Sequence, residues 1–117
     1  MGAFVISKRF NGDFKFVFTS RKGKVIYTSK GYSSKDACEK DIEVLRQKVT
    51  LESFQRAKAA NGKFFFKIGI NEEIFAVSRK YSTELRMKKG IDEIIKYSSG
   101  AEVLDFSENA DIFSDFA

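Results

Sequence analysis

The stretch NGDFKFVF, residues 11–18, recurs fifty positions later as NGKFFFKI, residues 61–68. In both copies an Asn-Gly pair precedes a run in which large apolar residues occupy every second position. This pattern is typical of a hairpin turn followed by a strand that buries one face. Further along the chain the two copies agree at an offset of 49, where Ser29, Tyr32, Ser33 and Ile42 match Ser78, Tyr81, Ser82 and Ile91. The chain is therefore predicted to contain one supersecondary unit twice.

Each copy is predicted to contain three strands, a helix and a further strand. In the first copy the strands are expected over residues 3–8, 13–20 and 25–29, and Ser33 is expected to cap the helix that follows. The helix carries one apolar stripe that should face a sheet, formed by Cys38, Ile42, Leu45 and Val49. The second helix repeats this stripe with Met87, Ile91 and Ile94 and has Ser82 as its expected cap. The runs 50–57 and 101–106 are predicted to be the strands that follow the helices.

The two copies are expected to form one domain over residues 1–106, with repeats at about 3–53 and 54–106. A unit of about 50 residues has only a marginal core of its own, so the copies should share one. Residues 107–117 lie past the repeat and are predicted to be a flexible tail. Their mixture of acids with Ile and Phe leaves an interaction motif as the alternative.

Charge divides the chain into a basic body and an acidic end. The net charge is +5, but residues 1–50 carry +6, residues 51–100 carry +4 and residues 101–117 carry −5. A basic body favours polyanionic partners, although lysines that serve only solubility would give the same count.

Two motifs of the first copy resemble those of the YegP-like family of small proteins. They are residues 11–16, NGDFKF, and residues 31–39, GYSSKDACE. Asp41 stands where that family usually has Gly, whereas the second copy keeps Gly90. The resemblance covers residues 3–106. It implies an α+β fold of tandem β(3)-α-β repeats, or a dimer of single units. One antiparallel sheet is then shared, with two helices on one face and the final strands exchanged between halves. It implies no catalytic or ligand-binding residue.

The composition argues against most enzyme chemistry. The chain has no histidine, which removes the commonest general base and the commonest metal ligand. Cys38 is the only cysteine and lies on the apolar stripe, so it is expected to be a buried hydrophobe and not a nucleophile. The carboxylates on the helices are expected to lie on solvated faces. We therefore predict no enzymatic activity, no metal and no cofactor.

The predicted binding surface is the sheet face opposite the helices. Its candidate residues are Lys15, Val17, Phe65 and Lys67, which alternate with the buried Phe positions. Aromatic and basic groups on an open sheet are typical of platforms for single-stranded nucleic acid. A solvated face and a homodimer contact are the alternatives.

The sequence as a whole predicts a small non-enzymatic binding or protein-interaction module, with single-stranded nucleic-acid binding through the open face as the alternative. The partner is expected to be a protein of unknown identity, with nucleic acid possible and no membrane. A monomer with an internal pseudo-twofold axis is expected in preference to a homodimer. The lone cysteine and the lack of a signal peptide or a long apolar run predict a cytoplasmic location.

Overall fold

The computed structural model describes residues 2–107. The elements are, in chain order, β1 (Ala3–Lys8), β2 (Phe14–Thr19), β3 (Val25–Ser29), α1 (Lys35–Lys48), a 3₁₀ turn η1 (Leu51–Ser53), β4 (Phe54–Lys58), β5 (Phe64–Ile70), β6 (Glu73–Ser78), α2 (Glu84–Tyr97), a 3₁₀ turn η2 (Ser98–Gly100) and β7 (Glu102–Asp105). The predicted tail lies outside the described residues, apart from Ser107.

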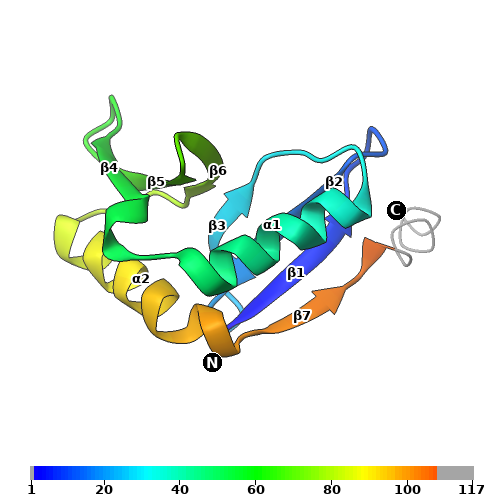
Figure 1. Ribbon diagram of the computed structural model, residues 1–117. Coiled ribbons are helices and arrows are strands. Elements are labelled where there is room, and N and C mark those ends of the chain that lie inside the picture. The colour runs from blue at the N-terminus through cyan, green and yellow to red at the C-terminus, as the bar shows by residue number, and fades with distance from the viewer. Residues whose placement is uncertain (1, 108–117) are drawn as a thin grey trace.

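The strands form a single sheet in the order β4-β5-β6-β3-β2-β1-β7, and both helices lie on one side of it (Figure 1). The predicted α+β class and the shared sheet are confirmed. The prediction of a wholly antiparallel sheet needs a correction, because β7 pairs in parallel with β1 and the sheet is mixed. The reason lies in the helix before it. The chain leaves α2 where β1 starts, with Glu102 opposite Ala3, and so β7 must run in the direction of β1.

One strand crosses from the second half to the first. β7 follows α2 and adds to β1 of the first half, whereas β4 starts the second half and pairs with β5 of that same half. The halves also join through β3 and β6, where Thr28 lies opposite Val77. These two junctions fuse the halves into one sheet with a continuous core.

A β-bulge interrupts the alternation in each half. Phe18 lies opposite Tyr27, but the next residue, Thr19, lies opposite Val25, which leaves Ile26 as an extra residue. Consequently both Ile26 and Tyr27 are buried on the helix side of the sheet. The second half repeats this arrangement at Phe75 and Ala76. A bulge thus gives each half a second core residue in its third strand.

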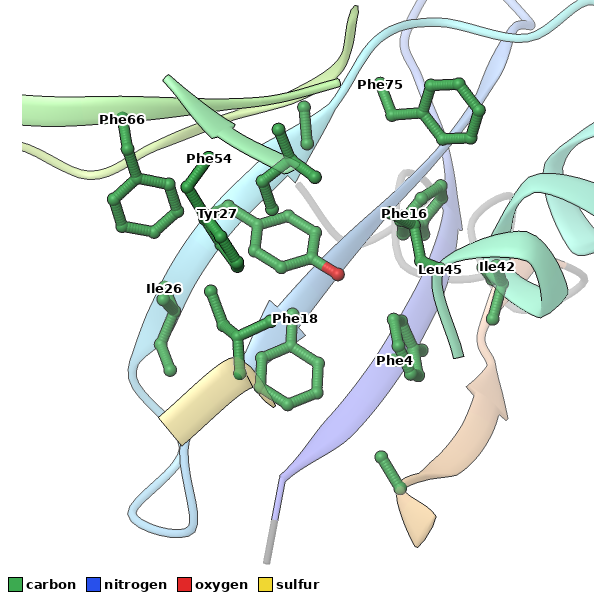
Figure 2. Close-up of a cluster of buried hydrophobic side chains, with 14 of the residues drawn as sticks. Phe4, Phe16, Phe18, Ile26, Tyr27, Ile42, Leu45, Phe54, Phe66 and Phe75 are labelled. Carbon is green, nitrogen blue, oxygen red and sulfur yellow. The ribbon is translucent and has the colours of Figure 1, made fainter. Parts of the chain in front are cut away.

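The core is a cluster of aromatic rings between the sheet and the helices. Figure 2 shows Tyr27 between rings of the second half, such as Phe66, and rings of the first half, such as Phe18. Tyr27 stacks on Phe18 with ring centroids 5.6 Å apart, and Phe18 meets Phe4 edge to face at 5.0 Å. Tyr27 is 1% exposed, and its hydroxyl has no hydrogen-bond partner within residues 2–107.

The helices begin one residue later than the sequence predicts. Ser34 caps α1 by accepting a 3.2 Å hydrogen bond from the Ala37 amide, and Thr83 caps α2 in the same way. Ser33 and Ser82 are not the caps, because a two-way backbone bridge to Phe14 or Phe64 holds the preceding tyrosine extended. The predicted strand 50–57 likewise starts late, at Phe54. Its first residues form the turn η1, in which the Ser53 hydroxyl accepts a hydrogen bond from the Thr50 amide.

Candidate functional site

The four residues of the predicted binding surface lie on the sheet face without helices. Lys15 and Val17 belong to β2, and Phe65 and Lys67 belong to β5. Each alternates with a buried neighbour of the core; Lys67 is exposed, and the other three are half-buried. The structure therefore places all four on the predicted face.

These residues do not form one patch, however. β3 and β6 lie between β2 and β5 in the sheet, so the two pairs are three strand spacings apart, roughly 14 Å. Val17 and Lys67 occupy one cross-strand row, joined through Thr28 and Val77. Because β2 and β5 run in opposite directions, Lys15 and Phe65 lie on opposite sides of that row. A ligand that touches Lys15 must therefore cross the row to reach Phe65.

A second surface, which sequence reasoning did not find, gathers far more charge. It is a groove between the β2–β3 turn and α2, made of two adjoining hollows of about 350 and 240 Å³. We call the smaller hollow the inner hollow and the larger one the outer hollow; Ser20 and Glu93 line both. The cationic residues of the groove are Arg21, Lys22, Lys24, Arg79, Arg86 and Lys89. Glu93 is the one acid that lines it.

Local backbone structure fixes both walls of this basic groove. In the β2–β3 turn the Ser20 amide donates to the Lys24 carbonyl at 2.8 Å, and the Lys24 amide donates to the Ser20 hydroxyl at 3.2 Å. Gly23 adopts a φ of 83°, a left-handed conformation that glycine takes without strain. On α2 the lining residues are spaced by three or four positions, from Arg86 to Tyr97, and so they share one helix face.

Tyr81 is one of the residues that line the inner hollow. Its ring stacks on Phe66 with centroids 6.3 Å apart, and the Arg79 guanidinium lies 5.5 Å from its centroid. A Cβ atom on Gly90 would lie only 2.4 Å from the Tyr81 hydroxyl, so the hydroxyl reaches the helix because residue 90 has no side chain. Burial raises the pKa of Tyr81, and Glu93 raises it further against the opposing effect of Arg79. The hydroxyl therefore keeps its proton at neutral pH and acts as a donor.

The equivalent place in the first half is already filled by the protein's own carboxylate. The Tyr32 hydroxyl donates a 2.7 Å hydrogen bond to Asp41, and Lys30 lies 5.4 Å from the Tyr32 ring centroid. Lys30 also pairs with Asp41 at 4.0 Å and with Glu73. Tyr32 stacks on Phe16 as Tyr81 stacks on Phe66. The backbone and the aromatic pair are thus the same in both halves.

The charges around the two tyrosines are reversed. At the offset of 49, Lys30 corresponds to Arg79, but Asp41 corresponds to Gly90 and Glu73 corresponds to Lys24. The two acids beside Tyr32 are therefore replaced beside Tyr81 by a glycine and a lysine. The cation beside Tyr32 is paired with acids of the protein itself, whereas the cations around Tyr81 are exposed to solvent.

Neither a metal-binding cluster nor an accessible cysteine lies in the described part of the chain. Within residues 2–107 no three His, Cys, Asp or Glu side chains lie close enough together to hold a metal ion. Cys38 is buried, and burial raises the pKa of its thiol to about 12, with Asp41, Glu39 and Asp105 adding to the effect. Its sulfur is therefore protonated and covered at neutral pH. Among residues 2–107 no helix has the length and apolar character to cross a membrane.

Comparisons with known proteins place the chain in a family. The model of the "Domain of unknown function (DUF1508)" matches twice, over residues 11–51 and 59–105. The UPF0339 protein YegP of Escherichia coli K12 is 32% identical over 106 residues, which are 89% of this chain and 96% of that protein. A UPF0339 protein of Photorhabdus laumondii is 28% identical over 93% of this chain and 97% of its own length.

Two structures determined by NMR have the same fold. The E. coli yegP protein, titled a protein of unknown function, superposes with a TM-score of 0.83 at 31% identity, covering 91% of this chain and 93% of that one. A UPF0339 protein of Shewanella oneidensis superposes with a TM-score of 0.84 at 28% identity, covering 92% of both chains. The double family match follows the two halves of the sheet. The chain therefore belongs to the DUF1508 family, and it carries the family domain twice.

Proposed function

We propose that this protein is a non-enzymatic binding module whose basic groove takes an acidic segment of a partner protein. The observation that carries the proposal is the set of six cations in the groove, none of which has an ion-pair partner within residues 2–107. A cytoplasmic setting fits this proposal, because a chain with a single buried thiol needs no oxidising compartment.

The electrostatics of the groove favour an anionic ligand. Ion pairs of the described chain lie outside the groove: Lys30 with Asp41 and Glu73, Lys35 with Asp105, and Arg46 with Glu43. In the groove a single acid, Glu93, faces six cations. A concave surface lined by one sign of charge concentrates field lines and attracts a ligand of opposite charge. The open sheet face, by contrast, presents exposed apolar groups such as Val77 together with its two lysines.

Single-stranded nucleic acid, the alternative ligand, requires aromatic rings that are free to stack on bases. The Tyr81 ring has Phe66 and Arg79 close to it, and Lys96 lies 5.3 Å from the centroid of Tyr97. On the open face Phe65 is half-buried, and it lies across the Val17–Lys67 row from Lys15. These observations favour recognition of acidic side chains over recognition of bases.

The test is the binding of a fluorescein-labelled decaglutamate peptide at low salt, followed by fluorescence anisotropy. Two variants each remove two cations from the groove: Arg21→Gln with Lys22→Gln in the outer hollow, and Arg86→Gln with Lys89→Gln at the inner one. The matched control removes two cations from the open face, with Lys15→Gln and Lys67→Gln. We expect each groove variant to weaken binding about tenfold or more, about 1.4 kcal/mol, and the control to change it less than about twofold.

A labelled oligothymidylate in the same assay decides between the two functions. If the proposal holds, the oligonucleotide binds no more tightly than the peptide, and any binding is lost in the groove variants. Tight oligonucleotide binding that only the open-face control abolishes would contradict the proposal and establish the nucleic-acid alternative. Absence of peptide binding in the unmodified protein would also reject the proposal.

A further inference from the structure

We propose that the inner hollow of the basic groove is a subsite for a phosphate monoester, such as a phosphoserine side chain on the acidic segment. This inference rests on the proposed function and specifies the ligand of the same groove. Its residues are Lys24, Arg79, Tyr81, Arg86 and Lys89, which surround the bare backbone of Gly90.

The first half of the molecule provides the structural precedent. There the hydroxyl of Tyr32, which corresponds to Tyr81, donates a 2.7 Å hydrogen bond to the Asp41 carboxylate. The ammonium group of Lys30, which corresponds to Arg79, lies 4.0 Å from the same carboxylate. In the second half the tyrosine and the cation are retained as Tyr81 and Arg79, but Gly90 supplies no carboxylate. The fold thus repeats an anion-binding arrangement without the internal anion.

The charge of the inner hollow fits a dianion better than a single carboxylate. In the first half one cation, Lys30, faces two acids, Asp41 and Glu73. Around Tyr81 the place of Glu73 is taken by Lys24, and Arg86 stands at the position of Ala37. With Arg79 and Lys89 the hollow has four cations against Glu93. A phosphate monoester carries a charge of about −1.5 to −2 at pH 7, and guanidinium groups match its oxygens in pairs.

The polar groups of the inner hollow are free to meet a ligand. Within residues 2–107 the Tyr81 hydroxyl has no hydrogen-bond partner, whereas the Tyr32 hydroxyl is committed to Asp41. Stacking on Phe66 and the bridge to Phe64 hold the Tyr81 ring in place before any ligand arrives. Arg79 lies against the same ring. The donors are therefore preorganised, which lowers the entropic penalty of binding.

The experiment compares two labelled peptides of identical acidic sequence, one with a central serine and one with phosphoserine. We expect the full-length protein to bind the phosphorylated peptide about tenfold more tightly. Inorganic phosphate at millimolar concentration should reduce this preference, and an oligonucleotide without terminal phosphates should not. Equal affinity for both peptides would overturn the phosphate subsite and leave the acidic groove standing. Binding of neither peptide would instead reject the proposed function itself.

Three variants test the residues, each against a matched control. Lys89→Gln should lose most of the preference, while Lys40→Gln, at the same position of the other helix, should keep it. Both Gly90→Asp and Gly90→Ala add a Cβ atom that must shift the Tyr81 hydroxyl, but only Gly90→Asp adds a carboxylate, at the position of Asp41 in the first half. Gly90→Asp should abolish the preference, and Gly90→Ala should retain more of it. Tyr81→Phe removes the hydroxyl donor alone and should reduce the preference. If the Gly90 variants do not fold, Lys89→Gln and Tyr81→Phe decide the question.

The pH dependence gives an independent readout. The chain has no histidine, which is the side chain whose ordinary pKa lies between about pH 5.5 and 7.5. A change in peptide affinity within this range can therefore be assigned to the phosphate. The second pKa of a phosphate monoester is about 6, so the preference for the phosphopeptide should grow as the pH rises through this range. Affinity for the unphosphorylated peptide should stay nearly constant. A preference that does not change with pH would contradict binding of the dianion.

Discussion

The hydroxyl of Tyr32 donates a 2.7 Å hydrogen bond to the carboxylate of Asp41. The corresponding hydroxyl, that of Tyr81, faces a glycine and has no acceptor within residues 2–107. In both halves the tyrosine forms a backbone bridge to a β-strand and stacks on a phenylalanine. The halves differ in the side chains that surround this tyrosine. The Tyr32 hydroxyl is bound within the protein, and the Tyr81 hydroxyl is the donor that we propose for a ligand.

The two tyrosines should differ in their contribution to stability. Tyr32→Phe leaves the partly buried Asp41 without its donor and should lower the free energy of unfolding by about 1–2 kcal/mol. Tyr81→Phe removes a hydroxyl without a protein partner and should change it by less than about 0.5 kcal/mol. Urea denaturation of both variants checks this. A double-mutant cycle of Tyr32→Phe with Asp41→Ala should show coupling near 1 kcal/mol, and purely additive effects would contradict it.

Tyr27→Phe should stabilise the protein. The Tyr27 hydroxyl is buried without a hydrogen-bond partner in the described chain, and burial raises the pKa of the phenol. Removing an unsatisfied buried polar group relieves a desolvation penalty, here expected at about 1–2 kcal/mol. Thermal unfolding followed by circular dichroism measures the change, and a lower midpoint for the variant would refute this prediction.

The two faces of the sheet should respond differently to the loss of a ring. Phe16 is 0% exposed and contacts the rings of Phe4, Tyr27 and Tyr32, so Phe16→Ala should reduce the free energy of unfolding by about 3–5 kcal/mol. Phe65→Ala, on the face without helices, should cost much less. Chemical denaturation of the two variants tests this. Equally large losses would mean that both faces of the sheet are covered.

Acid should weaken the contact between β7 and α1. Burial acts to raise the pKa of Asp105, but hydrogen bonds from Lys35 and Ser107 outweigh burial, and the net effect lowers that pKa below its usual value. A carboxylate with a depressed pKa stabilises the fold above its unfolded pKa, about 3.9, and the stabilisation is lost as the pH falls through the folded value. Asp105→Asn should therefore be less stable than the unmodified protein at pH 7. The two should converge as the pH falls through the lowered pKa of Asp105; a difference in stability that persists unchanged at low pH would contradict this assignment.

The regular features of the sequence predicted most of the fold. The repeated strands with alternating Phe residues gave β2 and β5, and the apolar stripes gave both helices, because side-chain periodicity reports directly on which face is buried. The bulges at Ile26 and Phe75 could not be predicted, since in strands of five and six residues a pair of adjacent apolar side chains does not distinguish a bulge from a strand with both faces covered. The parallel direction of β7 depends on where α2 delivers the chain, which is a tertiary property.

The candidate site was harder to predict than the fold. Lys15 and Phe65 could be assigned to the correct face, but their separation depends on strand order and direction, which alternation does not contain. The basic groove joins Arg21 and Lys22 to Arg86 and Lys89, more than sixty positions away. The one available signal was the charge reversal between the two copies, with Gly90 for Asp41 and Lys24 for Glu73. Its meaning becomes clear only when the structure places these residues around a tyrosine.

The most direct test of the central claim is an NMR titration of the ¹⁵N-labelled full-length protein with the acidic peptide and its phosphorylated form. We expect the amide shifts to concentrate in the β2–β3 turn and along α2, from Ser20 to Lys24 and from Tyr81 to Tyr97, with the phosphopeptide adding shifts at Tyr81 and Gly90. Residues of the open face, such as Val17 and Lys67, should stay unshifted. Shifts confined to that open face, with the groove unaffected, would contradict the account.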